Sequence, residues 1–143
     1  MNSNPPLTLA ANAHEAQRAL MLAAIGAWTA IVPYLARALG LEVNVPALVE
    51  VVDHVVPGAV VVAAGLYLHR AARRRTLARE RFALPAAGVA FLAGFWGLAT
   101  HVPLLQDASR SDVTWEAALF HFAAALPIVL LAGWFLLRSI PDS

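Results

Sequence analysis

Long apolar stretches alternate with short polar ones along this chain. A membrane-spanning helix needs about 20 mainly apolar residues. Each apolar stretch is too long for a strand and lacks the two-residue alternation of a membrane barrel strand, so helices are predicted. The sequence therefore predicts an all-α integral membrane protein, with one four-helix transmembrane bundle over residues 18–140. The four predicted spans are residues 19–39, 47–69, 82–104 and 114–140.

The placement of charge predicts how the bundle is oriented. The linker Arg70–Arg81 carries six arginines, whereas the other two linkers and their edges carry Glu42, Asp107 and Asp112. Arginine-rich short loops stay on the cytoplasmic side of a membrane. We therefore expect a multi-pass protein of the cell membrane with both termini cytoplasmic, preceded by a flexible cytoplasmic tail over residues 1–17.

Composition narrows the class of protein further. The chain is 60% hydrophobic and 13% charged, while soluble domains average about 25% charged residues. This excludes an ordinary soluble domain and a basic nucleic-acid-binding arm, so the expected surroundings are a lipid bilayer and no nucleic acid. The chain has no cysteine, which rules out disulfides and thiolate metal ligands.

A shift of 68 positions aligns parts of the chain with itself. Gly26-Ala27-Trp28 falls on Gly94-Phe95-Trp96, and residues 64–70 fall on residues 132–138. The sequence thus predicts two parallel-repeat helical hairpins, over about residues 18–70 and 86–138. In such a bundle the second and fourth spans are equivalent and can face each other across the centre.

Small residues mark the faces on which membrane helices approach closely. In the third span, Ala87, Ala90, Gly94, Gly97 and His101 recur at alternating spacings of three and four residues. This pattern predicts that Gly94 and Gly97 lie at a helix–helix contact. A histidine lies on the corresponding small-residue face of the second and fourth spans as well.

Three histidines are therefore expected in one half of the bundle. His54 and His121 each lie about two turns, roughly 10 Å, inside the outer end of their spans, and His101 lies near the outer end of the third span. Ionisable groups inside a bilayer are costly and normally face the interior, where they find partners. We expect His54 and His121 to face each other, with His101 nearer the outer surface.

Carboxylates accompany these histidines. Glu50 is four residues before His54 and shares its helical face, Asp53 is turned away from His54 by about 100°, and Glu116 lies slightly more than one turn before His121. A carboxylate beside a ligating histidine can hold its other ring nitrogen.

Neutral imidazole is a good ligand for haem iron, copper and zinc. Two alternative cofactor sites are therefore considered for this one cluster. In one, His54 and His121 are the axial ligands of a haem b, with Glu50 as the partner of His54. In the other, His54, His101 and His121 bind a transition metal ion. Either site suits redox chemistry or electron transfer.

The fragment Glu50-Val-Val-Asp-His54, set opposite His121, resembles the haem-binding four-helix halves of haem A synthase and other small membrane cytochromes b. The resemblance covers about two helices, and it implies a bis-histidine haem. The chain departs from that family in having no cysteine pair, no arginine beside its histidine and no second set of ligands.

Other functions are compatible with the same residues. The histidines can serve only to hold helices together, as in an accessory or assembly subunit of a larger membrane complex. They can also line a proton or ion path with Glu50 and Asp53, in a small oligomeric transporter. Either case implies a homo-oligomer or other membrane subunits as partners. We predict no catalytic residues, because the sequence has no phosphate-binding loop, metalloprotease motif or nucleophile elbow.

Overall fold

The computed structural model describes residues 6–40, 46–74, 82–110 and 114–138. Over this part of the chain the protein is helical throughout, without strands, and four helices are long and apolar enough to span a membrane. This confirms the prediction of an all-helical protein with four helices of membrane-spanning length and hydropathy. The elements are α1 (Pro6–Ala38), α2 (Ala47–Glu50), the π turn η1 (Val51–Val55), α3 (Val56–Arg74), α5 (Ala83–Ser109), α6 (Trp115–Phe122) and α7 (Ala125–Arg138).

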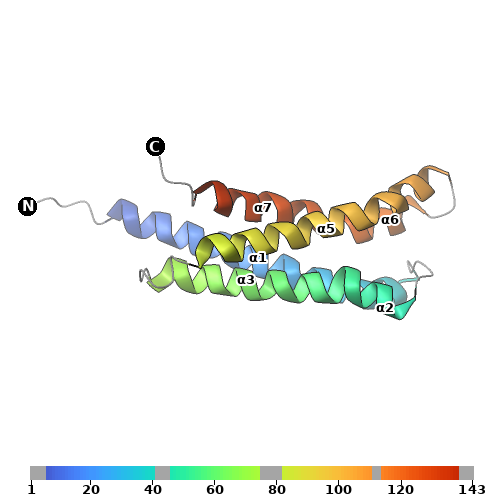
Figure 1. Cartoon of the computed structure of the whole chain (residues 1–143), viewed down its shortest axis with the longest axis horizontal. Coiled ribbons are helices and arrows are strands. Elements are labelled where there is room, and N and C mark those ends of the chain that lie inside the picture. The colour runs from blue at the N-terminus through green and yellow to red at the C-terminus, as the bar shows by residue number, and fades with distance from the viewer. Residues whose placement is uncertain (1–5, 41–45, 75–81, 111–113, 139–143) are drawn as a thin grey trace, which may run out of the picture.

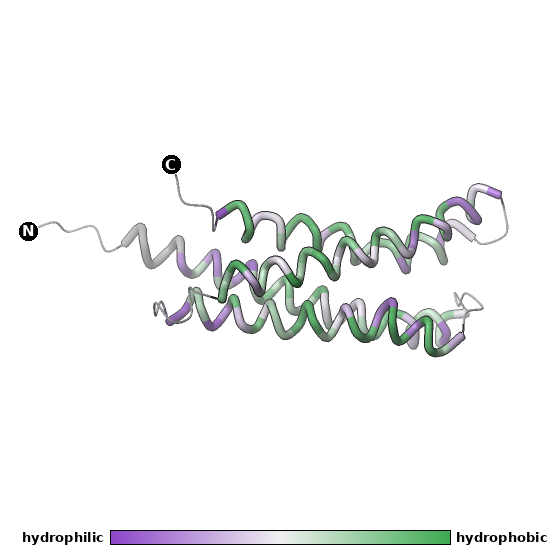
Figure 2. The backbone as a smooth tube through the Cα atoms, viewed as in Figure 1, coloured by the Kyte–Doolittle hydropathy of each residue, from purple (hydrophilic) through white to green (hydrophobic). Residues whose placement is uncertain are grey.

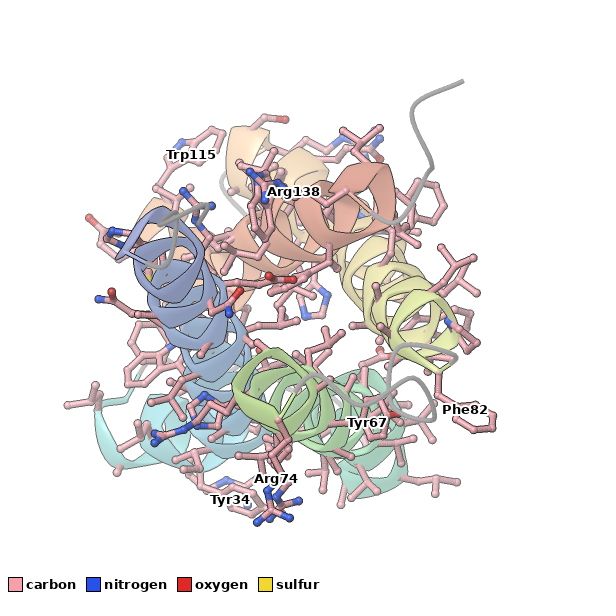
Figure 3. All side chains as sticks on the ribbon, turned by 90° about the vertical axis from the view of Figure 1, so that its left-hand side faces the viewer. Tyr34, Tyr67, Arg74, Phe82, Trp115 and Arg138 are labelled. Atoms are coloured by element: carbon pink, nitrogen blue, oxygen red, sulfur yellow. The ribbon has the colours of Figure 1, made fainter. Side chains whose placement is uncertain are left out.

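The helices run side by side along the long axis of the molecule (Figure 1). α2, η1 and α3 form one continuous span, and α6 and α7 form another. α1 packs on α3, α3 on α5, α5 on α6 and α7, and α7 returns to α1. The span containing α3 is therefore diagonally opposite the span containing α7, as the end-on view shows (Figure 3).

Glycines allow α1 and α3 to approach until their backbones touch. A Cβ atom added at Gly65 would lie 2.6 Å from the backbone nitrogen of Ala23, and one added at Gly58 would lie 2.7 Å from that of Ala30. Gly58 and Gly65 are seven residues, two turns, apart and therefore share one face of α3. The two helices can approach this closely because glycine has no side chain to hold the backbones apart.

The predicted contact of the third span is confirmed. A Cβ atom at Gly94 would lie 2.6 Å from Cγ2 of Ile128, and one at Gly97 would lie 3.3 Å from the Cβ of Ala125. The small-residue stripe of α5 thus faces α7.

The exterior of the bundle is apolar as well as its interior. Large side chains such as Leu92, Leu130 and Leu137 are more than 60% exposed, and Figure 2 shows hydrophobic residues along the length of the helices with polar ones mainly toward the ends. Such an exterior suits hydrocarbon, because lipid chains solvate leucine as well as a protein core does.

Two proline positions coincide with irregular backbone. Proline cannot donate a hydrogen bond to the carbonyl four residues earlier. Pro57 follows the π turn Val51–Val55, and Pro127 follows the break between α6 and α7 at Ala123 and Ala124. The irregular turns lie next to His54 and His121.

Three element boundaries differ from the sequence prediction, and one of them is the end of α3, which continues to Arg74, five residues beyond the predicted end of the second span. α1 begins at Pro6, so residues 6–17 are helical; their assignment as a flexible tail stays a prediction, and residues 1–5 lie outside the described part. α5 continues to Ser109, five residues beyond the predicted end of the third span. His101 consequently lies about two turns inside its helix, deeper than expected, because Pro103 is accommodated without ending the helix.

Candidate functional site

Three helices each bring one histidine to the same point inside the bundle. His54 lies in η1, His101 in α5 and His121 in α6, and their exposed fractions are 6%, 5% and 8%. The ring centroids are 4.8 Å apart for His54 and His101, 5.6 Å for His54 and His121, and 6.4 Å for His101 and His121. The structure therefore brings together the three histidines that the sequence singled out, with His101 in direct contact with His54.

Backbone carbonyls fix the protonation of two of the rings. The Nδ1 atom of His101 lies 2.8 Å from the Gly97 carbonyl oxygen, and that of His121 lies 2.8 Å from the Ala117 carbonyl oxygen. A carbonyl oxygen only accepts, so we assign the proton of each neutral ring to Nδ1. The Nε2 atoms of His101 and His121 then carry lone pairs. Thr100 Oγ1 provides a second polar contact to Nδ1 of His101, at 3.0 Å.

The third ring has the opposite tautomer. The Nε2 atoms of His54 and His101 lie 3.0 Å apart. Because Nε2 of His101 carries a lone pair, Nε2 of His54 must donate, which leaves the lone pair of His54 on Nδ1. That Nδ1 atom is buried without a hydrogen-bond partner. The backbone carbonyl of Glu50, four residues earlier, faces the same ring.

Two carboxylates lie beside the histidines. Glu50 has only 13% of its side chain exposed, and its Oε2 lies 3.7 Å from a guanidinium nitrogen of Arg37 on α1. Asp53 Oδ1 accepts a hydrogen bond from Trp96 Nε1 at 3.2 Å. The sequence placed Asp53 on a face turned away from His54, whereas in the π turn both line the same cavity.

That cavity has a volume of about 220 Å³. It is smaller than most small-molecule pockets, which run from about 300 to 1,000 Å³, and its size suits an ion with water or a small ligand. Glu116, the remaining carboxylate that the sequence suggested, is exposed and is not among the lining residues. The lining consists of Val49, Glu50, Asp53, His54, Thr100, His101, Pro103, Leu104 and His121.

Some members of the site have no signal in the sequence. Arg37 and Trp96 contact the two carboxylates from other helices, and Thr100 contacts the His101 ring. Arg37 lies near the predicted outer end of its span, where a basic residue is ordinary, and Trp96 lies in an apolar stretch. Only the packing of the helices brings Arg37 and Trp96 against the carboxylates that line the cavity.

Within the part of the chain that the structure describes, no set of three or more His, Asp or Glu side chains already has the arrangement of a metal site.

Comparison with family models, with curated proteins and with solved structures finds no match to this chain. The chemistry of the site therefore rests on its own geometry.

Proposed function

We propose that this protein binds a transition metal ion through the Nε2 atoms of His54, His101 and His121, with the cavity at the open coordination position. The observation that carries the proposal is the convergence of three buried imidazoles, two of which direct Nδ1 to a backbone carbonyl. Metal-ligating histidines are oriented in this way, because a hydrogen bond at one ring nitrogen fixes the lone pair on the other.

The distances between the rings support a three-histidine site after a small adjustment. A tetrahedral zinc site with metal–nitrogen bonds of about 2.0 Å has ligand nitrogens about 3.3 Å apart and ring centroids about 5 Å apart. The His54–His101 pair has a nitrogen separation of 3.0 Å and a centroid separation of 4.8 Å. His121, at 5.6 and 6.4 Å from the other rings, must move inward by about 1 Å to complete such a site.

The tautomer of His54 also favours a cation. A metal on Nε2 of His54 would shift the proton of that ring to Nδ1. The Nδ1–H group would then donate a hydrogen bond to the Glu50 carbonyl. The buried nitrogen that has no partner would then gain one. An unsatisfied buried polar group costs about 1–3 kcal/mol, so this gain would add to the binding free energy. All three histidines would then have the same arrangement, with Nδ1 bound to the carbonyl four residues earlier.

A metal ion fits the site better than a haem does. Iron ligation by His54 and His121 requires a porphyrin between the two rings. The Nε2 atom of His54 is already hydrogen-bonded to His101, and the cavity of about 220 Å³ is small for an organic cofactor. A haem would have to break that bond and widen the bundle, whereas an ion replaces the shared proton.

Metal binding to the purified full-length protein tests the proposal. We expect Zn²⁺ or Cu²⁺ to bind in a one-to-one ratio by isothermal titration calorimetry, and His54→Ala, His101→Ala and His121→Ala each to abolish binding. His69→Ala is the matched control. Its Nδ1 also lies 2.8 Å from a carbonyl oxygen, that of Ala16, but His69 lies in α3, away from the three site histidines. Binding that survives the first three substitutions would contradict the proposal. A haem absorbance band lost only with His54 and His121 would instead support the haem site.

Proton transfer is the second candidate function. The His54–His101 hydrogen bond joins two titratable rings, and Glu50 and Asp53 line the adjoining cavity. Together they form the inner part of a proton or ion path. In this reading Glu50→Gln impairs flux through reconstituted protein while the fold is kept.

The finer features of the architecture belong to the same proposal. We infer from the arginine-rich linker that both termini are cytoplasmic and that the histidine site lies in the outer half of the membrane. The pairing of α1 with α3 and of α5 with α7 supports two repeated hairpins. The apolar exterior leaves room for a second copy or other membrane subunits beside the lipid.

A further inference from the structure

Arginines gather at the end of α3 that is far from the histidine site. This is the left-hand end of α3 in Figure 1, and Arg74 is labelled there in Figure 3. His69 is fixed there, since its Nδ1 lies 2.8 Å from the carbonyl oxygen of Ala16 on α1. This bond joins the two helices where the apolar spans give way to polar residues. The basic side chains that follow His69 on α3 are Arg70, Arg73 and Arg74.

Two cavities meet at this end. One, of about 530 Å³, lies between α1 and α3, and the other, of about 520 Å³, is lined by His69, Arg70, Arg73 and Arg74. His69 and Arg73 line both, and we call the two cavities together the basic groove. Among the described residues, neither cavity is lined by an aspartate or glutamate. The remaining lining residues of the first cavity are Asn12, Ala13, Ala16, Gln17, Leu20 and Ala72.

The groove combines two kinds of surface. One part offers guanidinium groups, which bind phosphate oxygens through paired hydrogen bonds. The other offers small apolar side chains such as Ala13, Ala16 and Leu20 beside the amides of Asn12 and Gln17. A ligand with a phosphate at one end and a glycerol ester or acyl chain at the other would match both parts.

We propose that the basic groove binds the phosphate group of an anionic phospholipid. The groove lies at the end of the membrane-spanning part of α3, which is the depth of lipid headgroups. Arginines near a membrane surface attract anionic lipids in any case. The proposal goes further, because it places the phosphate in a cavity that Arg73 and His69 share between two helices. It does not depend on the metal site.

Lipid retention by the full-length protein tests this proposal. Protein purified in neutral detergent is incubated with equal amounts of phosphatidylglycerol and phosphatidylcholine, and bound lipid is counted by native mass spectrometry. We expect phosphatidylglycerol to be retained preferentially. Arg73→Gln should weaken its retention about fivefold, the value of one basic residue at a membrane surface. Arg110→Gln, an exposed arginine at the end of α5, is the matched control and should change nothing.

Competition with inorganic phosphate shows whether the groove binds free phosphate or only the phosphate group of a lipid. If millimolar phosphate displaces the lipid, the groove takes phosphate itself; if it does not, the acyl and glycerol parts contribute. Both outcomes support a phosphate site. Equal retention of the two lipids, or equal effects of Arg73→Gln and Arg110→Gln, would overturn it. An unchanged circular dichroism spectrum and an unchanged thermal midpoint of the Arg73→Gln variant show that the groove, and not the fold, has been lost.

Discussion

Nε2 of His54 and Nε2 of His101 lie 3.0 Å apart, although the two residues are 47 positions apart in the chain. Both rings are buried, and they share one proton. This contact joins the π turn before α3 to the middle of α5. It is the only hydrogen bond that we find between two of the three histidine rings, within the described residues.

Replacement of one histidine of this pair should cost more than replacement of both. His101→Leu would remove the acceptor of the His54 Nε2 proton and leave that ring without any partner. We expect a loss of about 1–3 kcal/mol, as for other unsatisfied buried groups. In the double variant His54→Leu/His101→Leu no unpaired imidazole remains. The loss of stability of the double variant in detergent, from denaturant titration, should be smaller than that of either single variant. A loss equal to the sum of the two single losses would contradict the hydrogen bond between the rings.

Zn²⁺ should stabilise the folded protein. A ligand that binds only the folded state at a concentration 100 times its dissociation constant adds about 2.7 kcal/mol. We therefore expect the thermal midpoint in detergent to rise with Zn²⁺ and the rise to vanish on acidification, because protons compete with the metal for imidazole. His121→Ala should remove the effect and His69→Ala should keep it. A rise of equal size in both variants would point to binding elsewhere.

Glu50→Gln should weaken metal binding without unfolding the protein. The carboxylate lines the cavity beside the rings, and its partner Arg37 is 60% exposed, so loss of this ion pair costs little stability. Loss of a carboxylate beside a metal site typically reduces affinity about 10–100-fold. Glu116→Gln, an exposed carboxylate outside the cavity, is the control. Identical Zn²⁺ affinities for the two variants in a calorimetric titration would remove Glu50 from the site.

Gly65→Ala should destabilise the bundle. The new methyl group would meet the backbone of Ala23, which cannot move aside as a flexible side chain can. Gly88→Ala is the matched control, since nothing lies within 4 Å of its Cβ position and alanine favours a helix. Thermal midpoints in the same detergent should fall for the first variant and stay or rise for the second. A loss of equal size in both would show that the α1–α3 contact is looser than the structure indicates.

The absence of cysteine makes the orientation easy to measure. Phe82→Cys and Ser109→Cys place single thiols at exposed positions flanking or ending α5. In intact cells we expect a membrane-impermeant maleimide to label residue 109 and to spare residue 82, because the arginine-rich linker should remain inside. Labelling of residue 82 alone would reverse the proposed topology and place the histidine site on the cytoplasmic side.

The four spans could be predicted because hydrophobic length is a local property of the chain. The same holds for the contact at Gly94, since small residues at helical spacing identify a face without naming its partner. The positions of proline in a sequence show only which helical hydrogen bonds are missing. They did not show the response, which was a π turn before Pro57, a break before Pro127 and none at Pro103.

The sequence by itself determined that three histidines lie inside apolar spans, because each histidine is part of the apolar segment that forms its span. Only the tertiary structure decided that the rings meet, that His101 sits as deep as His54, and that Asp53 turns toward the cavity. These features depend on the length of α5, on the π turn and on which helices are neighbours. Those in turn are set by contacts between glycines and residues that are distant in the chain, such as Gly58 with Ala30 and Gly65 with Ala23, so no local pattern could have fixed them.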